Sequence, residues 1–374
     1  METETTPGKR ITLREIISCM IFIGFIGVFF VLNLIIPEPD ILVSERRIPA
    51  KFPEISLNAV MDGTFMSGFD DYASDRFVFR DTFRRIYAFQ ILDVFRQTDK
   101  SGLYRCNSVG LGEFKRVDTT SFRQTAERIN RAAELVAASD VNIYFSIVPD
   151  KSIYAERYYP GFNLDTAESV ILDVLGRYNY IRVADVVGAD MFYKTDLHWD
   201  QSKIKETASH ILSGMNANPV IADHPVVTVG EWSGVYAGQL AVPTVPDMMS
   251  YVDVPGLSVM YLNDRTLEFD PGPLYDFDRF NGIDPYDMFL RGPQPLITLE
   301  NPAVPGDKEL YLFRDSFGSS LAPLMAGAYS KITVIDLRYI NLLILDQFFE
   351  FTPGSDVLFI FSSQIFNNPS IIQA

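Results

Sequence analysis

The stretch ELYLFRDSFGSSLAPLMAGAYSKITVIDL, residues 309–337, decides the fold class of this chain. Its β-branched and aromatic residues predict strands at Glu309–Phe313 and Ile332–Leu337, with a helix at about Phe317–Ala328 between them. Strands that alternate with helices in this way lie parallel in one sheet, and the helices cover its faces. The stretch therefore predicts an α/β domain with a mainly parallel sheet.

The same alternation extends in both directions from this stretch. Apolar periodicity predicts further helices at about 79–94, 120–138, 166–177, 203–215 and 342–349, and further strands at 141–150, 180–186 and 357–362. Residues 219–305 interrupt the pattern, because they hold 12 of the 22 prolines. We expect an irregular, short-stranded insertion that lies over the edge of the sheet, where substrate contacts are common.

An apolar run precedes the domain. Residues 16–36, IISCMIFIGFIGVFFVLNLII, contain no charge and are long enough to cross a bilayer as a helix. Basic residues precede the run and acidic residues follow it, which predicts a cytoplasmic tail at 1–10, a transmembrane anchor in the lipid bilayer at 11–36, and an extracytoplasmic domain at 37–374. A cleaved signal peptide is the alternative, but the run is long and no small-residue cleavage site follows it.

Charge and cysteine content narrow the function. The formal net charge of -16 provides no basic surface for nucleic acid or another polyanion, so neutral or acyl-bearing substrates are favoured. Of the two cysteines, Cys19 lies in the apolar run and Cys106 lies outside it. Neither a disulfide nor a cysteine metal site is expected.

Ser316 is a candidate nucleophile because it lies where a predicted strand ends and a helix begins. This position places its hydroxyl at the carboxyl end of the sheet and turns the first helical N–H groups toward an oxyanion that forms there. Gly318 would let the backbone approach closely. An ordinary helix N-cap requires the same residue type at the same place, so the position alone leaves both roles open.

A candidate base lies in YKTDLHWD, residues 193–200, which holds one of only three histidines. In an extended segment Asp196 and His198 point to the same side, so the carboxylate can accept from Nδ1 and leave Nε2 free as a base. Trp199 would then anchor the loop in the core. A buried structural histidine bonded to Asp196 is the alternative.

The other histidines are poorly placed for chemistry. His210 lies off the apolar stripe of its predicted helix, and His224 lies in a proline-flanked loop. Asp200 could join Asp196 and His198 as metal ligands, but zinc or iron usually takes further histidine or cysteine ligands. We therefore expect neither a metal nor another cofactor.

Five stretches together resemble the DHHW family of bacterial envelope proteins. That family is related to the alginate-acetylation proteins of the AlgX and AlgJ type, within the SGNH hydrolase-like superfamily. The resemblance implies a three-layer SGNH-like (flavodoxin-like) fold. The stretches span about residues 44–340 and are SERRIPAKFP, FDDYASDRFVFRD, VPDKSIYAERYYP, YKTDLHWD and FRDSFGSSLAPLMAGAYSKITVIDLRYI.

The resemblance assigns roles to individual residues. It implies Asp196 and His198 as the acid and base members of a triad, with Ser316 as the nucleophile, in an order permuted from ordinary SGNH esterases. Arg338, in DLRYI, is a weaker candidate for a contact with substrate or with the serine loop; a surface residue at a strand end is the alternative. Apart from the resemblance, Trp232 in the insertion could stack on a sugar ring, although hydrophobic packing is the favoured explanation.

The chain departs from the SGNH pattern at two places. Arg314 and Asp315 precede the serine where SGNH serines usually follow Gly-Asp, and the separate Gly and Asn oxyanion donors cannot be located. His-Trp-Asp replaces the double histidine that the family name indicates. The oxyanion hole is therefore the least defined part of the predicted site.

These observations predict a membrane-anchored O-acetyltransferase that faces outward and acts on a cell-envelope polysaccharide. The resemblance further implies a multi-span membrane O-acyltransferase as the partner that supplies acetyl groups. A carbohydrate esterase with the same triad is one alternative. A non-catalytic polysaccharide-binding or assembly protein with the same fold is the other.

Overall fold

The computed structural model describes residues 12–37, 39–156, 161–217 and 223–373. It divides into two compact units, a smaller one at Met1–Tyr87 and a larger one at Ala88–Ala374. The sequence assigned all of 37–374 to one domain, whereas the structure groups the described residues up to Tyr87 with the N-terminal helix. The predicted tail at 1–10 and the insertion's first residues, 219–222, lie outside the described residues.

The smaller unit consists of helices. Helix α1, Leu13–Ile35, begins at a capping box in which Thr12 and Glu15 bond each other's backbone N–H groups. No side chain of α1 is buried, and α1 is the only helix in the described part of the chain that is long and apolar enough to cross a membrane. A membrane anchor and a signal sequence both fit this finding. Helices α2 (Leu57–Met61), α3 (Thr64–Asp75) and α4 (Arg80–Phe89) follow.

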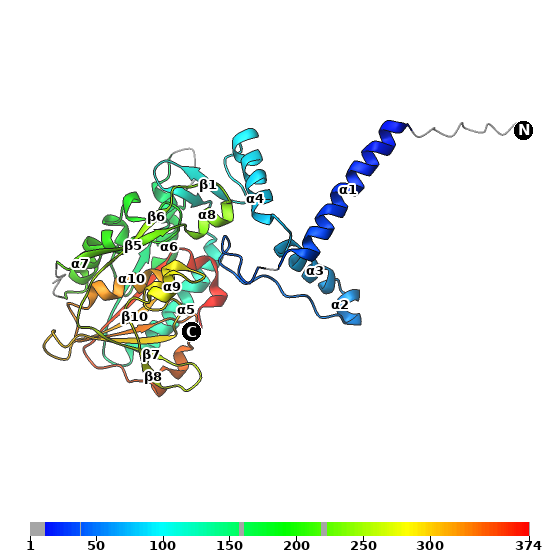
Figure 1. Ribbon diagram of the computed structural model, residues 1–374. Coiled ribbons are helices and arrows are strands. Elements are labelled where there is room, and N and C mark those ends of the chain that lie inside the picture. The colour runs from blue at the N-terminus through cyan, green and yellow to red at the C-terminus, as the bar shows by residue number, and fades with distance from the viewer. Residues whose placement is uncertain (1–11, 38, 157–160, 218–222, 374) are drawn as a thin grey trace, which may run out of the picture. The chain divides into compact units, whose positions relative to one another are not determined.

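The larger unit is built on an eight-stranded sheet of order β4-β3-β12-β10-β11-β9-β7-β8. Figure 1 labels its strands β7, β8 and β10. The five strands from β4 to β11 are parallel, and the last three are antiparallel to their neighbours. In sheet order the strands are Asn179–Tyr180, Asn142–Val148, Asp356–Ser362, Glu309–Arg314, Lys331–Ile335, Leu296–Glu300, Ser258–Leu262 and Phe269–Pro271.

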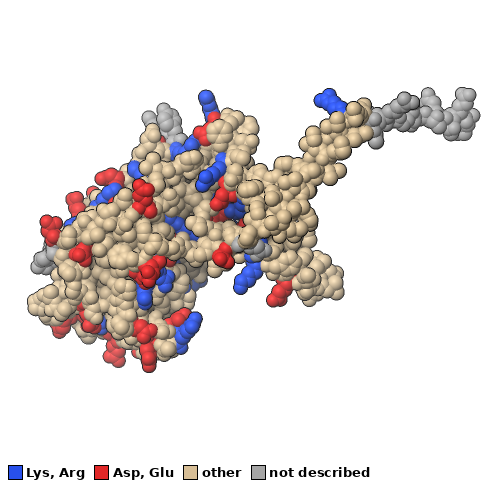
Figure 2. Space-filling model, viewed as in Figure 1, with Lys and Arg blue, Asp and Glu red and all other residues tan. Residues whose placement is uncertain are grey.

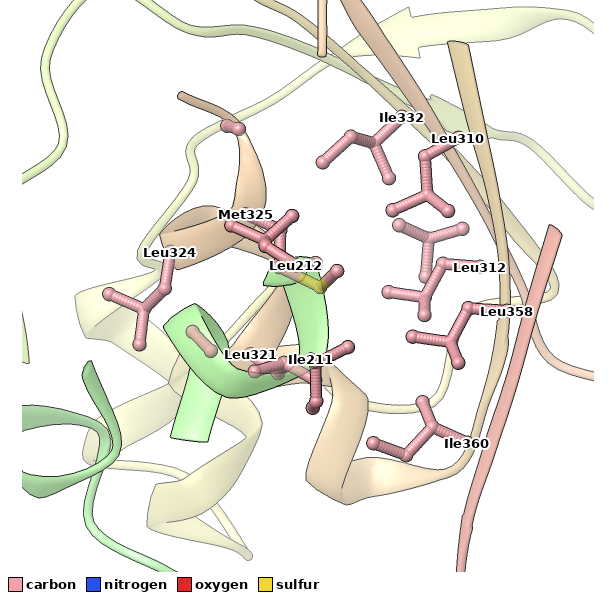
Figure 3. Close-up of a cluster of buried hydrophobic side chains, with 14 of the residues drawn as sticks. Ile211, Leu212, Leu310, Leu312, Leu321, Leu324, Met325, Ile332, Leu358 and Ile360 are labelled. Atoms are coloured by element: carbon pink, nitrogen blue, oxygen red, sulfur yellow. The ribbon is translucent and has the colours of Figure 1, made fainter. Parts of the chain in front are cut away.

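Helices cover both faces of this sheet, as the sequence predicted. Helices α5 (Thr119–Ala137) and α6 (Leu164–Leu175) pack on one face, and α7 (Lys205–Gly214) and α10 (Ser316–Met325) pack on the other. Side chains of β10 alternate between the two layers: Leu310 and Leu312 point toward α7 and α10, where Figure 3 shows them. Tyr311 and Phe313 belong to the layer under α5 and α6. Burial on both faces explains the continuous apolar sequence of this strand.

The insertion does more than lie over the sheet edge. Three of its strands, β7, β8 and β9, extend the main sheet, with β9 pairing antiparallel to β11. Two others, β5 (Val226–Trp232) and β6 (Asp247–Val252), form a separate antiparallel pair. The short helices α8 (Val235–Leu240) and α9 (Phe277–Phe280) complete it.

Several predicted elements differ in detail. The strand expected at 180–186 ends at Tyr180, and Val183–Asp185 form a 3-10 helix instead. The helix expected at 342–349 is a 3-10 helix, Leu342–Gln347. Helix α4 continues as a π-helical turn at Gln90–Val94. A hairpin of β1 (Leu103–Cys106) and β2 (Gly110–Glu113) was not predicted.

Candidate active site

The histidine loop at residues 193–200 is a tight turn and not the extended segment that the sequence predicted. Phe192 and Trp199 pair as an isolated bridge, and the Tyr193 N–H donates to the His198 carbonyl across the turn. Asp196 and His198 nevertheless lie side by side. Asp196 Oδ1 accepts from the His198 backbone N–H at 3.0 Å and meets Nδ1 at 2.7 Å.

Ser316 completes a continuous chain of three side chains. Its Oγ lies 2.7 Å from His198 Nε2. Asp196 is fully buried and His198 is 6% exposed, while Ser316 is partly exposed. An Nδ1–H that donates to Asp196 leaves Nε2 to accept from the serine hydroxyl, which is the tautomer that a general base requires.

Ser316 is not the N-cap of its helix. Asp315 has that role, since its Oδ1 accepts from the Phe317 N–H at 3.0 Å. Its Oδ2 accepts from the Ser362 N–H at 2.8 Å and so joins the start of α10 to the end of β12. The N-cap alternative for Ser316 is therefore wrong, and its hydroxyl faces His198 instead.

The first turn of α10 lies directly on the side chain of Arg314. A Cβ at Gly318 would stand 2.4 Å from Arg314 Cβ, so only glycine fits there. The Phe317 N–H is bonded to the Asp315 side chain and the Gly318 N–H to the Asp315 carbonyl. These two N–H groups are engaged at the start of α10, and the expectation that the first helical N–H groups face an oxyanion stays a prediction.

The insertion holds the outer oxygen of Asp196. The Val235 N–H, at the start of α8, donates to Asp196 Oδ2 at 2.9 Å. The preceding Gly234 N–H donates to Thr195 Oγ1 at 2.7 Å, and a Cβ at Gly234 would lie 2.4 Å from Asp196 Cβ. Both carboxylate oxygens are thus engaged. The sequence analysis missed this contact, for which the small residues in WSGVY are the only local signal.

A buried lysine holds the histidine loop from the other side. Lys151 follows β3 and is 2% exposed; its Nζ donates to the carbonyls of Tyr193 at 2.8 Å and Asp196 at 2.7 Å. Burial lowers the pKa of Lys151 to about 8, although the nearby Asp196 opposes this effect. The sequence analysis missed Lys151, although it lies in the quoted motif VPDKSIY just after a predicted strand.

Tyr286 lies flat against the histidine ring. The ring centroids of Tyr286 and His198 are 3.9 Å apart with an interplanar angle of 9°. The Tyr286 hydroxyl lies 2.8 Å from Ser320 Oγ, which also accepts from Trp199 Nε1 at 2.8 Å. Burial raises the pKa of Tyr286 well above its ordinary value, so the phenol stays neutral. This insertion residue also escaped the sequence analysis.

Arg338 lies beside the serine loop through a shared carboxylate. Its Nε and Nη2 donate to the two oxygens of Asp336 at 2.8 and 2.6 Å. The fully buried Arg314 also reaches Asp336, with Nη1 at 3.2 Å from Oδ2. Asp336 therefore connects the ends of β10 and β11, and the partly exposed Arg338 forms the outer member of this network.

Trp232 packs inside the protein. It is 5% exposed and contacts Tyr193 edge-on, with centroids 4.9 Å apart. Tyr236 and Tyr261 of the insertion are buried as well, at 3% exposure each. These aromatic side chains support the histidine loop and the sheet edge and offer little surface to a sugar ring.

The described residues contain no group of three or more histidine, cysteine or acidic side chains that could hold a metal ion. Asp200, a ligand in the metal alternative, instead accepts from the backbone N–H and hydroxyl of Ser202. His210 lies on α7, and Cys19 and Cys106 are both free.

A large cavity of the structure lies away from the three aligned side chains. It measures about 430 Å³ and lies between α5 and residues 342–353, with mostly apolar side chains around it. Ser316, which is intermediate in exposure, does not line this cavity.

No family model matches the chain, and no curated protein matches it. Several solved structures match it. A DHHW family protein from Eubacterium siraeum is 18% identical with a TM-score of 0.54, and the alignment covers 71% of this chain and 94% of that one. PatB1 from Bacillus cereus, solved with a sulfonyl adduct, is 14% identical with a TM-score of 0.56, over 74% of this chain and 99% of that one.

The fold is SGNH-like. The O-acetyltransferase domain of Pseudomonas putida AlgJ aligns more distantly, with a TM-score of 0.42 and 11% identity over 71% of this chain and 92% of that one. The fold class expected from the sequence is thereby confirmed, and the neighbours include the families that the motifs indicated. At these identities the likeness concerns the fold.

Proposed function

We propose that this protein is a membrane-anchored O-acetyltransferase that moves an acetyl group through acyl-Ser316 onto a cell-envelope polysaccharide. The observation that carries the proposal is the unbroken chain of 2.7 Å contacts from Asp196 through His198 to Ser316. A histidine between a buried carboxylate and a partly exposed serine is the arrangement that activates a serine nucleophile.

The reaction would proceed in two halves. Ser316 Oγ attacks the carbonyl carbon of an acetyl ester while His198 Nε2 takes the hydroxyl proton, and collapse of the tetrahedral intermediate releases the protonated leaving group and acetyl-serine. A sugar hydroxyl then gives its proton to His198 and attacks the acetyl carbon, which regenerates Ser316. Asp196 stabilises the imidazolium in both halves.

Chemistry of the known neighbours supports this reaction class. PatB1 carries a sulfonyl adduct, and the AlgJ domain is named for O-acetyl transfer. The acceptor would be neutral or weakly charged, because the chain carries a net charge of -16 and Figure 2 shows acidic and basic side chains interspersed on the visible face of the larger unit. A multi-span membrane acyltransferase would deliver the acetyl group.

The test uses the full chain in detergent with p-nitrophenyl acetate, with and without an oligosaccharide acceptor. We expect Ser316→Ala and His198→Ala to lower p-nitrophenol release by on the order of 10⁴-fold, or to the background rate. Val245→Ala, at an exposed site of the larger unit, is the matched control.

The reaction products distinguish a transferase from an esterase and from a non-catalytic binding protein. Acetylated oligosaccharide in the wild-type reaction supports the transferase, whereas free acetate alone at every acceptor concentration would make the protein an esterase. Release that is equal in the wild type and both triad variants would leave a polysaccharide-binding protein that retains the fold.

A further inference from the structure

The loop between α3 and α4 packs on one side of helix α1. Phe25, Phe29 and Asn33 recur every four residues and therefore line one side of α1. Phe29 stacks on Phe77 with centroids 5.6 Å apart, and Phe83 lies at the same distance. Asn33 Oδ1 accepts from the Val78 N–H at 2.9 Å, which fixes the loop to the helix.

Large apolar side chains surround this junction and remain exposed. We define the elbow as residues 76–87, the loop and most of α4. Its exposed apolar residues are Phe77, Phe79, Phe83, Ile86 and Tyr87, each between 40% and 56% exposed. A cluster of this size is unfavourable in water and indicates a surface that something apolar covers.

Two arginines of the elbow form ion pairs within the elbow or with the preceding segment. Arg84 Nη1 lies 3.2 Å from both Glu45 Oε1 and Asp81 Oδ1, and Arg80 also pairs with Glu45. The elbow is thus amphipathic, with an apolar side and a basic polar side, which is the character of a helix that lies in a membrane interface.

The point at which the elbow meets α1 indicates that lipid covers the exposed apolar residues of the elbow. Phe29 precedes the end of α1 at Ile35 by six residues, which is about 9 Å of helix at 1.5 Å per residue. Interfacial helices place their apolar sides about 5–10 Å into the boundary between headgroups and acyl chains. The apolar side chains of α1 therefore meet those of the elbow at this depth, through the contacts of Phe29 with Phe77 and Phe83.

We propose that the elbow lies in the outer lipid leaflet beside α1 and anchors the smaller unit at two points. The inference rests on the proposed membrane anchoring, but not on the acetyl transfer reaction. A protein partner or a second copy of the chain would be the other possible covers, and both would keep lipid away from the elbow.

Depth-dependent quenching tests the proposal on the full chain in lipid nanodiscs. The only native tryptophans, Trp199 and Trp232, are buried in the larger unit and give a constant background. Ile86→Trp adds a probe to the elbow, Phe22→Trp adds one to α1, and Val245→Trp adds one to an exposed site of the larger unit. Fluorescence is compared in ordinary lipid and in lipid brominated near the headgroup or deeper in the acyl chain.

We expect the Ile86→Trp signal to fall most with lipid brominated near the headgroup, and the Val245→Trp signal to match the background. An unquenched Ile86→Trp beside a quenched Phe22→Trp would overturn the elbow proposal and leave the anchor intact. If neither probe is quenched, α1 is not in the bilayer and the elbow proposal fails with it. Acetyl transfer measured on the same preparations reports on the proposed function separately.

Discussion

Asp196, His198 and Ser316 are each held in place by a contact that is separate from the hydrogen bonds among the three side chains. Asp196 is fixed by the Val235 N–H, His198 by the flat contact with Tyr286, and Ser316 by the capped start of α10. Such support fixes the reacting groups before substrate arrives and lowers the cost of orienting them.

Lys151 gives the site a pH-dependent stability. Because its pKa is lowered to about 8 in the folded protein from 10.5, the unfolded chain binds more protons between these values and the wild type becomes more stable as pH rises. Relative to Lys151→Met, the free energy of unfolding of the wild type should rise by about 2 to 3 kcal/mol between pH 7 and pH 10.

Denaturation of both proteins in detergent, followed by tryptophan fluorescence, measures this difference. Lys151→Met should also lower kcat with little change in KM, because the carbonyls of Tyr193 and Asp196 lose their donor. A pH-independent difference in stability would contradict the buried titration.

Tyr286 offers a matched pair of variants. Tyr286→Ala removes the ring that holds His198 flat and should lower kcat by about 10-fold or more, whereas Tyr286→Phe keeps the ring and loses only the contact with Ser320. Steady-state kinetics with p-nitrophenyl acetate measures both. Equal losses in the two variants would show that the hydroxyl, and not the ring, matters.

At the element scale, the strand–helix–strand unit of β10, α10 and β11 could be predicted because its residues are apolar on both faces and its turn is short. The position of Ser316 followed from it. The strands β7 and β9 could not be placed, since each is only five residues long. β9 pairs with the sheet edge that β11 leaves open, and β7 pairs with β9.

The contacts of the insertion with the site could not be predicted from the sequence either. Val235 and Tyr286 lie 39 or more residues from the aspartate and histidine they contact, and neither has a sequence pattern that points to chemistry. Asp196 and His198 were predictable because their contact is local. For Trp232 the sequence left sugar stacking open beside the favoured hydrophobic packing, and the side chain is buried.

Asp315 connects the start of α10 to the end of β12. Asp315→Asn keeps an oxygen for the Phe317 N–H but places an N–H₂ group against the buried Ser362 N–H. An unpaired buried donor costs about 1–3 kcal/mol, so the free energy of unfolding should fall by that amount. Chemical denaturation checks it, with Asp62→Asn, an exposed cap in the smaller unit, as the control.

At the scale of the whole molecule, the proposed topology places α1 in the membrane and the larger unit outside the cytoplasm. The two cysteines provide a direct test, because Cys19 lies in α1 and Cys106 lies at the end of β1, partly exposed. A membrane-impermeant maleimide added to intact cells should label the wild type and should not label Cys106→Ser.

If Cys106 is labelled only after the cells are opened, the larger unit faces the cytoplasm, which is opposite to the proposed orientation. Mass spectrometry of the mature N-terminus in the same sample decides between an anchor and a cleaved signal sequence. Retention of α1 is expected.

Direct detection of the acyl-enzyme shows whether Ser316 is the nucleophile. The full chain is mixed with p-nitrophenyl acetate, quenched in acid and digested, and the site of acetylation is read by mass spectrometry. We predict acetyl on Ser316 in the wild type, none in His198→Ala within the same time, and faster loss of the label when an oligosaccharide acceptor is added. Turnover without acetyl on Ser316, or turnover that persists in Ser316→Ala, would contradict the account.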